Sequence, residues 1–428
     1  MKHQFPEYFL WGASTAAHQV EGNNIHSDFW LMENLKGSMF KERSGDAVAH
    51  YRLYREDIAL MAKLGLNAYR FSIEWARIEP EEGVFDETAI EHYRDVLNTC
   101  NEYNITPIVT LHHFTSPVWL IRLGGWESEE APTRFARYCT KVMSELGEHI
   151  PYVCTINEAN IAIGIAKVIN RRQSEGTAQV GINTDMAARM EMYYQEVSKA
   201  FGLPPKEIHS FLGPRSEYGM DIIFKAHVEA RNSIRQVSPR TQIGITMSLY
   251  DIQSIPGGEE HAAHALHEEF LQFRPYLVDD DFFGLQNYTR SVYGPDGMLP
   301  IPDGAEKTQM GNEFYPQGLE SVIRCISTHL DKPIIITENG VSTDHDERRV
   351  AFLDRALKGV HACIDDGIPV KGYMHWSLLD NFEWQLGFSK CFGLIAVDRS
   401  TQQRHPKQSA FHYGKIATTN ELPDISQA

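Results

Sequence analysis

The sequence predicts an α/β fold, a single (β/α)8 TIM barrel with long βα loops, formed by one domain over residues 1–428. Two observations lead there. Eight short runs rich in β-branched and aromatic residues alternate with helical patterns, as expected for βα units whose parallel strands are buried on both faces. No linker, repeat or low-complexity segment divides the chain. A typical barrel uses about 250 residues, so the surplus is assigned to loops and extra helices.

The predicted strands are spaced widely enough for a helix to follow each of them. The runs are 9–13, 68–73, 106–111, 152–156, 242–247, 282–285, 334–337 and 370–375. Apolar residues at helical spacing predict helices over 57–64 and 129–146. The longest stretch without a clear assignment is 160–220.

A doubly wound sheet with a second domain is the alternative fold. Its usual nucleotide-binding mark, G-x-G-x-x-G after the first strand, is absent, since that strand continues as Gly12-Ala13-Ser14. The phosphate-binding pattern G-x-x-x-x-G-K-[ST] does not occur either. An enzyme that uses a dinucleotide or a nucleoside triphosphate is therefore not expected.

The charge balance excludes several classes of partner. Lys and Arg number 40 and Asp and Glu 57, a net charge of −17 that disfavours nucleic acids and anionic membranes. The six cysteines form no C-x-x-C pair, and no run of about 18 apolar residues or secretion-type leader occurs. We expect a cytoplasmic location and no nucleic-acid or membrane partner. Whether the chain forms a homo-oligomer is left open.

Polar residues follow the predicted strands, at the end of a barrel where chemistry takes place. Glu158 ends the fourth run and Glu338 the seventh, so the two face each other across the barrel mouth. Glycoside hydrolysis uses two opposed carboxyls. One protonates the leaving oxygen, and the other either attacks the sugar or activates water. Two solvated loop glutamates are the alternative at this point.

Five motifs, in order along the chain, resemble glycoside hydrolase family 1, the β-glucosidase and β-glycosidase family. They begin near the N-terminus with Phe9-Leu10-Trp11-Gly12 through Gln19-Val20-Glu21-Gly22, and they continue with Tyr69-Arg70-Phe71-Ser72, Thr155-Ile156-Asn157-Glu158, Ile336-Thr337-Glu338-Asn339-Gly340 and Trp376-Ser377-Leu378-Leu379-Asp380-Asn381-Phe382-Glu383-Trp384. The resemblance spans residues 5–398 and is weak over 160–220.

The resemblance implies catalytic roles for four residues. Glu158 matches the general acid/base, and Glu338 matches the nucleophile of a mechanism that retains configuration through a covalent glycosyl-enzyme. Arg70 matches the arginine that keeps this nucleophile ionised, and Tyr288 matches the tyrosine that donates to it. Since a negative Glu338 disfavours a second charge nearby, Glu158 is expected to be protonated until Glu338 becomes an ester.

Six further residues match the family's contacts to the nonreducing-end sugar: Gln19, His113, Asn157, Trp376, Glu383 and Trp384. Trp376 matches the platform under the sugar ring, and Asn157 the contact to the 2-hydroxyl. Glu383 argues against 6-phospho-sugars, because an acidic side chain would repel the phosphate.

The chain also departs from the family pattern. Ala159 stands where a proline is usual, and Asn160 where many members have a tryptophan. His18 replaces a common tyrosine. Gln286 takes the place of an asparagine, so we expect the contact of that asparagine with the site to come from Gln286.

One cluster resembles a metal site. His261, His264 and His267 precede Glu268, but the H-E-x-x-H pattern is absent, and the stretch is better read as a polar helix face beginning near Glu259. No metal and no cofactor are expected.

The sequence therefore predicts a retaining β-glycosidase, β-glucosidase-like, that hydrolyses small β-glucosides. The open alternatives are the same chemistry used for transglycosylation and, less favoured, a non-hydrolytic sugar-binding barrel.

Overall fold

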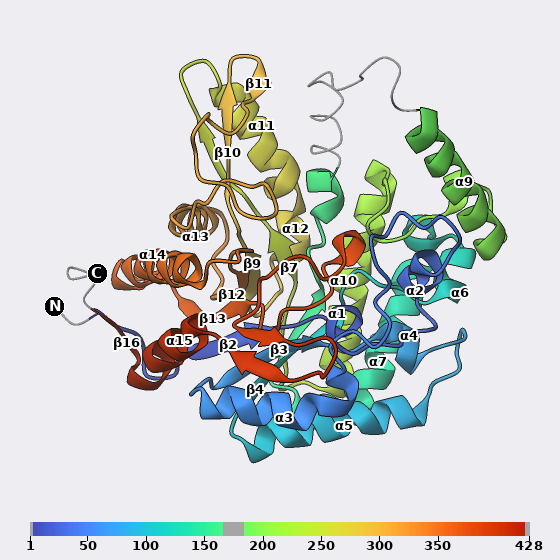
Figure 1. Ribbon diagram of the computed structural model, residues 1–428, viewed down its shortest axis with the longest axis horizontal. Coiled ribbons are helices and arrows are strands. Elements are labelled where there is room, and N and C mark those ends of the chain that lie inside the picture. Colours follow the sequence, from blue (N-terminus) through green and yellow to red (C-terminus); the bar gives the residue numbers. More distant parts are fainter. Residues whose placement is uncertain (1–2, 166–183, 424–428) are drawn as a thin grey trace.

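The centre of the molecule is a barrel of parallel strands surrounded by helices, as Figure 1 shows, and it confirms the predicted fold class. The computed structural model describes residues 3–165 and 184–423. Seven of the eight predicted runs each form one strand, and the fifth forms two. The barrel strands are β2 (Leu10–Ser14), β3 (Ala68–Ser72), β4 (Thr106–His112), β5 (Tyr152–Ile156), β6 (Gln242–Gly244), β7 (Thr246–Ser248), β9 (Phe283–Gln286), β12 (Ile334–Asn339) and β13 (Val370–Trp376).

The barrel closes through one broken strand. The fifth predicted run divides at Ile245 into β6 and β7. β6 pairs in parallel with β5, whereas β7 pairs in parallel with β9. The two halves of one strand therefore join the two edges of the sheet, whose order is β6-β5-β4-β3-β2-β13-β12-β9-β7.

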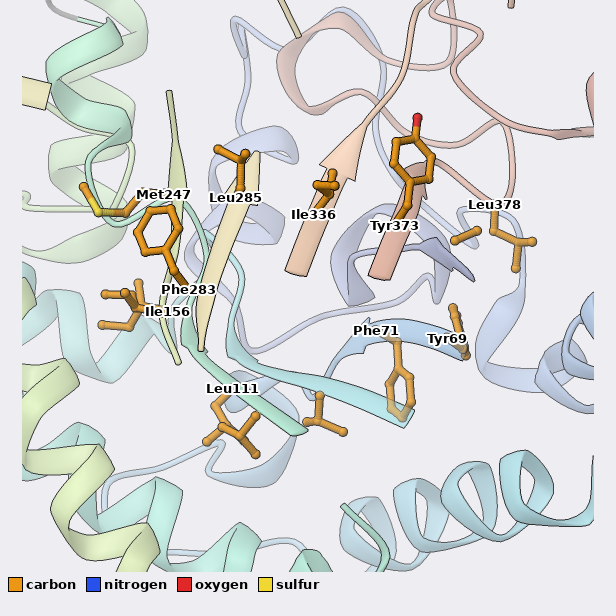
Figure 2. Packing of buried hydrophobic residues seen from close by; sticks show 14 of the residues in the cluster. Tyr69, Phe71, Leu111, Ile156, Met247, Phe283, Leu285, Ile336, Tyr373 and Leu378 are labelled. Atoms are coloured by element: carbon orange, nitrogen blue, oxygen red, sulfur yellow. The ribbon is translucent and has the colours of Figure 1, made fainter. Parts of the chain in front are cut away.

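Alternate residues of the strands point to opposite faces of the sheet. On β3, Tyr69 and Phe71 belong to the large core cluster between strands and helices, part of which Figure 2 shows. Ala68 belongs instead to a second, smaller cluster with Ile108 and Met374. Arg70 follows Ala68 on that face, so an apolar layer lies under polar residues at the carboxyl ends of the strands.

Helices cover the outside of the barrel (Figure 1). The predicted helix over 57–64 is the end of a longer one, and the helix predicted over 129–146 begins at Ala131. The helices are α1 (Ala17–Val20), α2 (Asp28–Glu33), α3 (His50–Lys63), α4 (Trp75–Ile78), α5 (Glu87–Glu102), α6 (Val118–Arg122), α7 (Ala131–Leu146), α9 (Thr184–Phe201), α10 (Glu217–Val237), α11 (Glu259–Glu269), α12 (Arg274–Leu277), α13 (Gly318–His329), α14 (Asp346–Asp365) and α15 (Gln408–Thr419), with 3-10 turns at Gly125–Glu127, Gly147–His149, Pro205–Glu207, Leu271–Phe273 and Trp384–Leu386.

Sequence signals explain where several helices begin. The Asp86 side chain accepts hydrogen bonds from the backbone N–H of Thr88 and Ala89 at the start of α5. Ser216 accepts from Gly219 at the start of α10. Such caps satisfy backbone donors that have no partner in the first turn.

Among the described residues, three small sheets of short strands lie outside the barrel, and one of them stands at the top of Figure 1. β8 (Asp251–Ser254), β10 (Arg290–Gly294) and β11 (Gly297–Met298) form one small sheet next to α11. β14 (Ile395–Val397) pairs with β15 (Arg404–Pro406), and β1 (His3–Gln4) pairs with β16 (Glu421–Leu422) near both chain ends.

The stretch 160–220, which the sequence left without a clear assignment, is partly helical. α9 packs Tyr193, Val197 and Phe201 against Ile121 of α6. Residues 166–183 of this stretch lie outside the described residues. Within the described part of the chain, no helix is long and apolar enough to cross a membrane.

Candidate active site

A cavity of about 350 Å³ opens at the carboxyl ends of the barrel strands. Seven of the ten predicted site residues line it: His113, Glu158, Tyr288, Glu338, Trp376, Glu383 and Trp384. The other three, Gln19, Arg70 and Asn157, are buried and hydrogen-bonded to these lining residues or to one another. The structure thus brings together all ten residues.

Two donors hold the Glu338 carboxyl. Arg70 Nη1 donates to Oε1 at 2.6 Å, and the Tyr288 hydroxyl donates to Oε2 at 2.6 Å. Glu338 lies in β12 and Arg70 in β3, and both are buried. Each oxygen of the carboxyl therefore has one charged or polar partner.

These partners oppose the effect of burial on Glu338. Burial raises the pKa of the Glu338 carboxyl above its usual value, and the Arg70 charge and the hydrogen bonds from Tyr288 and Arg70 reduce this rise without cancelling it. For Arg70, burial lowers the pKa but the Glu338 charge raises it, with a net rise. The contact with Arg70 thus favours the ionised form of Glu338 relative to a buried carboxyl that has no charged partner.

Glu158 has a different environment. It follows β5 in a left-handed backbone conformation, with φ of 43°, which is uncommon outside glycine. Burial and the negative charge of Glu338 raise its pKa to about 8, against smaller lowering by Ser248 and Arg70. At neutral pH this carboxyl is therefore protonated. One cavity thus holds a proton donor and a carboxylate.

Asn157 is fixed by its side-chain oxygen. Oδ1 accepts from Arg70 Nη2 at 2.5 Å, Gln286 Nε2 at 2.7 Å and Thr246 Oγ1 at 3.2 Å. Its buried Nδ2 has no hydrogen-bond partner among the described residues. The amide is therefore oriented with its donors available to a ligand. The contact expected of Gln286 is present.

Gln19 and Glu383 form a second polar pair. Gln19 Nε2 donates to the backbone oxygen of Phe382 at 2.8 Å and to Glu383 Oε2 at 3.4 Å. Gln19 Oε1 is buried, and the described residues give it no partner. Burial, followed by the charge of Glu338, raises the pKa of Glu383 to about 8. A protonated Glu383 both donates and accepts, which suits a neutral hydroxyl.

Aromatic rings form one wall of the cavity. The His113 ring lies 5.9 Å from Trp376 and 6.0 Å from Trp384, each at an interplanar angle of 25°. Burial, helped by the charge of Arg70, holds the pKa of His113 well below its usual value. His113 is therefore neutral. The flat faces suit the C–H face of a sugar ring.

An apolar side of the cavity was not predicted. Ile161, Leu212, Leu249, Tyr250 and Met310 line it. Leu249 and Tyr250 lie within three residues of the end of the fifth predicted run, so their position was a usable signal. Leu212 and Met310 come from irregular segments, where no periodic pattern marks a lining residue.

The histidine-rich stretch is a helix face, as expected. α11 begins at Glu259, and His264 pairs with Glu268 at 3.2 Å. His261 contacts the backbone oxygen of Pro295 at 3.1 Å. Over residues 3–165 and 184–423, no three histidine, cysteine or acidic side chains are placed to hold a metal ion. That the chemistry needs no cofactor stays a prediction.

Comparison with known proteins gives close matches over nearly the whole chain. The family model of glycosyl hydrolase family 1 matches residues 1–192 and 301–422. Beta-glucosidase A of Thermotoga maritima is 29% identical over 450 aligned residues, which cover 98% of this chain and 99% of that protein.

Solved structures are also similar. The β-glycosidase BGL167 is 46% identical, with a TM-score of 0.89 and 99% of both chains covered. A β-glycosidase from Pyrococcus horikoshii is 34% identical, with a TM-score of 0.80, covering 99% of this chain and 97% of that one. Because the family model covers more than half of the chain, the protein belongs to glycosyl hydrolase family 1 and is a glycoside hydrolase of the β-glycosidase type.

Proposed function

We propose that this protein is a retaining β-glycosidase that hydrolyses small β-glucosides with Glu338 as nucleophile and Glu158 as acid/base. One observation carries the proposal: two buried carboxyls line one cavity, and of the two it is Glu338 that pairs directly with Arg70. Arg70 and Tyr288 each donate to Glu338, whereas the pKa of Glu158 is raised to about 8. This is the division between nucleophile and proton donor that double displacement requires.

In the first step, the ionised Glu338 attacks the anomeric carbon. Glu158 gives its proton to the leaving oxygen, and the bond from that oxygen to the sugar breaks. Sugar and Glu338 are then joined as an ester. Arg70 and Tyr288 hold the attacking carboxyl in place and stabilise its charge before attack.

In the second step, Glu158 acts as a base. The ester carries no charge, so burial still raises the pKa of Glu158 but the part of the rise that came from the Glu338 charge is gone. Glu158, now deprotonated, takes a proton from water as that water attacks the anomeric carbon. Glu338 leaves as a carboxylate, and both groups return to their starting states.

The remaining polar groups support a neutral sugar as substrate. Asn157 Nδ2 offers hydrogen-bond donors and Gln19 Oε1 an acceptor, and neither atom has a partner in the described part of the protein. Trp376 would support the sugar ring. Glu383 offers no cation to a 6-phosphate. We propose that a small β-glycoside is the substrate and that the protein acts in the cytoplasm. We propose no nucleic-acid partner and no membrane partner.

The apolar side of the cavity supports an aryl or alkyl leaving group. It also favours a second candidate, transglycosylation, because an apolar surface there binds an organic acceptor in place of water. Product analysis with a β-glucoside donor and rising alcohol concentration separates the two: a growing share of alkyl glucoside supports transfer.

Replacing Glu338 by glycine tests the function directly. Glu338→Gly should lose all hydrolysis of an aryl β-glucoside, because no nucleophile remains. Azide should restore turnover of an activated aryl glucoside, and the product should be the α-glucosyl azide, since a single displacement inverts the anomeric centre. Chloride at the same ionic strength is the control. A Glu338→Gly enzyme active without azide overturns the assignment.

A further inference from the structure

Beside the acid/base, the fifth strand breaks and its hydrogen-bond ladder with β5 ends; we call this interruption of the ladder the gap. β5 pairs with β6 up to Cys154 and Gly244. Beyond Ile245 the strand changes partner, and Thr246 pairs with Gly284 of β9. The segment that continues from β5 into Glu158 therefore runs alongside β7 without a regular ladder between the two strands.

Two backbone donors of the turn that carries Glu158 cross this gap. The Glu158 N–H donates to Thr246 Oγ1 at 3.0 Å, and the Ala159 N–H donates to the backbone oxygen of Thr246 at 3.1 Å. A proline at position 159 has no N–H and could not make the second bond. Alanine thus allows a tie to β7 that the usual family residue forbids.

The Asn160 side chain makes the remaining ties. Its Oδ1 accepts from the Ser248 N–H at 3.0 Å, and its Nδ2 donates to the Ser248 oxygen at 2.8 Å. Nδ2 also donates to the backbone oxygen of Glu269 at 3.1 Å. Asn160 is buried. Its amide thus pairs with the N–H and C=O of one residue, as a neighbouring strand would.

We propose that Asn160 is a positioning residue of the reaction: its clamp on Ser248 fixes the turn that carries Glu158 and holds the Ser248 hydroxyl beside the acid/base carboxyl. The inference rests on the proposed function. Asn160 does not line the cavity, whereas Ser248 and Glu158 both do.

The backbone at Glu158 explains why such a clamp is needed. A residue other than glycine is disfavoured at φ of 43°, so the surrounding structure must hold it there. Burial of the turn deprives it of water as a substitute partner. Without Asn160, the N–H and C=O of Ser248 would lose their partners, and the turn would be free to relax.

The charges around Glu158 support the same inference. Burial raises the pKa of Glu158, as do the charges of Glu338 and Glu383, whereas the hydrogen bonding of Ser248 and the charge of Arg70 lower it. Tyr250 and Tyr288 line the same cavity. Losing the Ser248 contact would therefore raise the pKa of Glu158 further.

Leaving groups distinguish positioning of an acid from general support of the fold. Phenol is a poor leaving group and needs protonation, whereas dinitrophenolate departs without it. We would measure kcat/KM for phenyl and dinitrophenyl β-glucoside across pH in wild type, Asn160→Ala and Ser248→Ala.

Asn67→Ala is the matched control. Asn67 makes the same kind of clamp at the other end of the barrel: Oδ1 accepts from the Trp11 N–H at 2.7 Å, and Nδ2 donates to the Phe9 oxygen at 3.1 Å. Loss of this clamp should leave the ratio of the two substrates unchanged.

Asn160→Ala should lower kcat/KM for the phenyl glucoside about 10- to 100-fold and for the dinitrophenyl glucoside less than about 3-fold. In both site variants the alkaline limb of the phenyl profile should move to higher pH. Turnover of the dinitrophenyl glucoside shows that each variant is folded. Ser248→Ala, which removes only a hydroxyl, keeps the test available if Asn160→Ala does not fold.

An equal loss on both substrates, no loss, or an unshifted alkaline limb in both site variants would overturn the proposal. The wild-type rate on the dinitrophenyl glucoside tests the proposed function separately. The positioning role is judged only on how the ratio of kcat/KM for the two substrates changes from wild type to each variant.

Discussion

The two carboxyls of the site are held in different ways. Glu338 is held by its own oxygens, which accept from Arg70 and Tyr288. Glu158 is held chiefly through its backbone, by bonds from residues 158–160 to β7. Arg70 pairs directly with Glu338 but not with Glu158. At Glu158, the Arg70 charge is one of the smaller contributions to the pKa.

This difference fits the roles that we propose for the two groups. A nucleophile has to keep its charge inside a buried site, so it needs a charged partner at contact distance. An acid/base has to gain and lose a proton, and a strong ion pair would fix one state. Holding Glu158 by its backbone gives it a defined position while leaving its carboxyl free to titrate.

Removing the cation that pairs with Glu338 should cause the largest loss of activity. Arg70→Met should lower kcat/KM about 1,000-fold for phenyl and dinitrophenyl glucosides alike, because Glu338 loses a charged donor in a buried site. Arg70 lowers the pKa of Glu338, so the acidic limb of the pH profile should move to higher pH. Arg70→Lys, which keeps the charge, is the control. A loss confined to the phenyl glucoside would contradict this division of roles.

Removing the acid should have a smaller effect that depends on the leaving group. Glu158→Ala should cost about 100-fold or more in kcat/KM on the phenyl glucoside and little on the dinitrophenyl glucoside. In wild type, the phenyl rate should fall as pH rises through about 8, where Glu158 loses its proton. Azide should give the variant a β-glucosyl azide, since Glu338 still acts first. Recovery of the α-glucosyl azide would instead indicate that Glu158 is the nucleophile and Glu338 the acid/base.

The smallest effect concerns stability. The pKa of Glu158 is raised from 4.5 to about 8 by folding, so the folded protein holds a proton that the unfolded chain releases between these values. Stability is therefore lost as pH rises through this window. Glu158→Gln, which cannot ionise, should raise Tm by about 2 °C near pH 9 and leave it unchanged near pH 4. Thermal unfolding of both proteins at the two pH values checks this, and equal Tm values near pH 9 would refute it.

Much of the barrel was predictable because parallel strands buried on both faces leave a clear pattern. The runs at 68–73 and 106–111 are rich in β-branched and aromatic residues, and both form strands. The break at Ile245 was not predictable. It arises because the fifth strand has to pair with β5 at one end and β9 at the other, a requirement set by closure of the whole barrel.

The same limit holds at the site. Position after a strand, together with the family resemblance, predicted the ten residues that the structure gathers at one end of the barrel. The bonds of Asn160 and Ser248 were not predictable, because their positions are 88 residues apart and meet only at the gap between β5 and β7.

The sequence, with its family resemblance, predicted the fold class, the end of the barrel that carries the polar residues and the two glutamates proposed as catalytic. These follow from local patterns, since each strand's composition and the residue after it can be read one segment at a time. The tertiary structure alone decided how Glu158 is held and which burial and charges set the pKa of each carboxyl. Both depend on burial and on charges from distant segments, which exist only once the chain is packed.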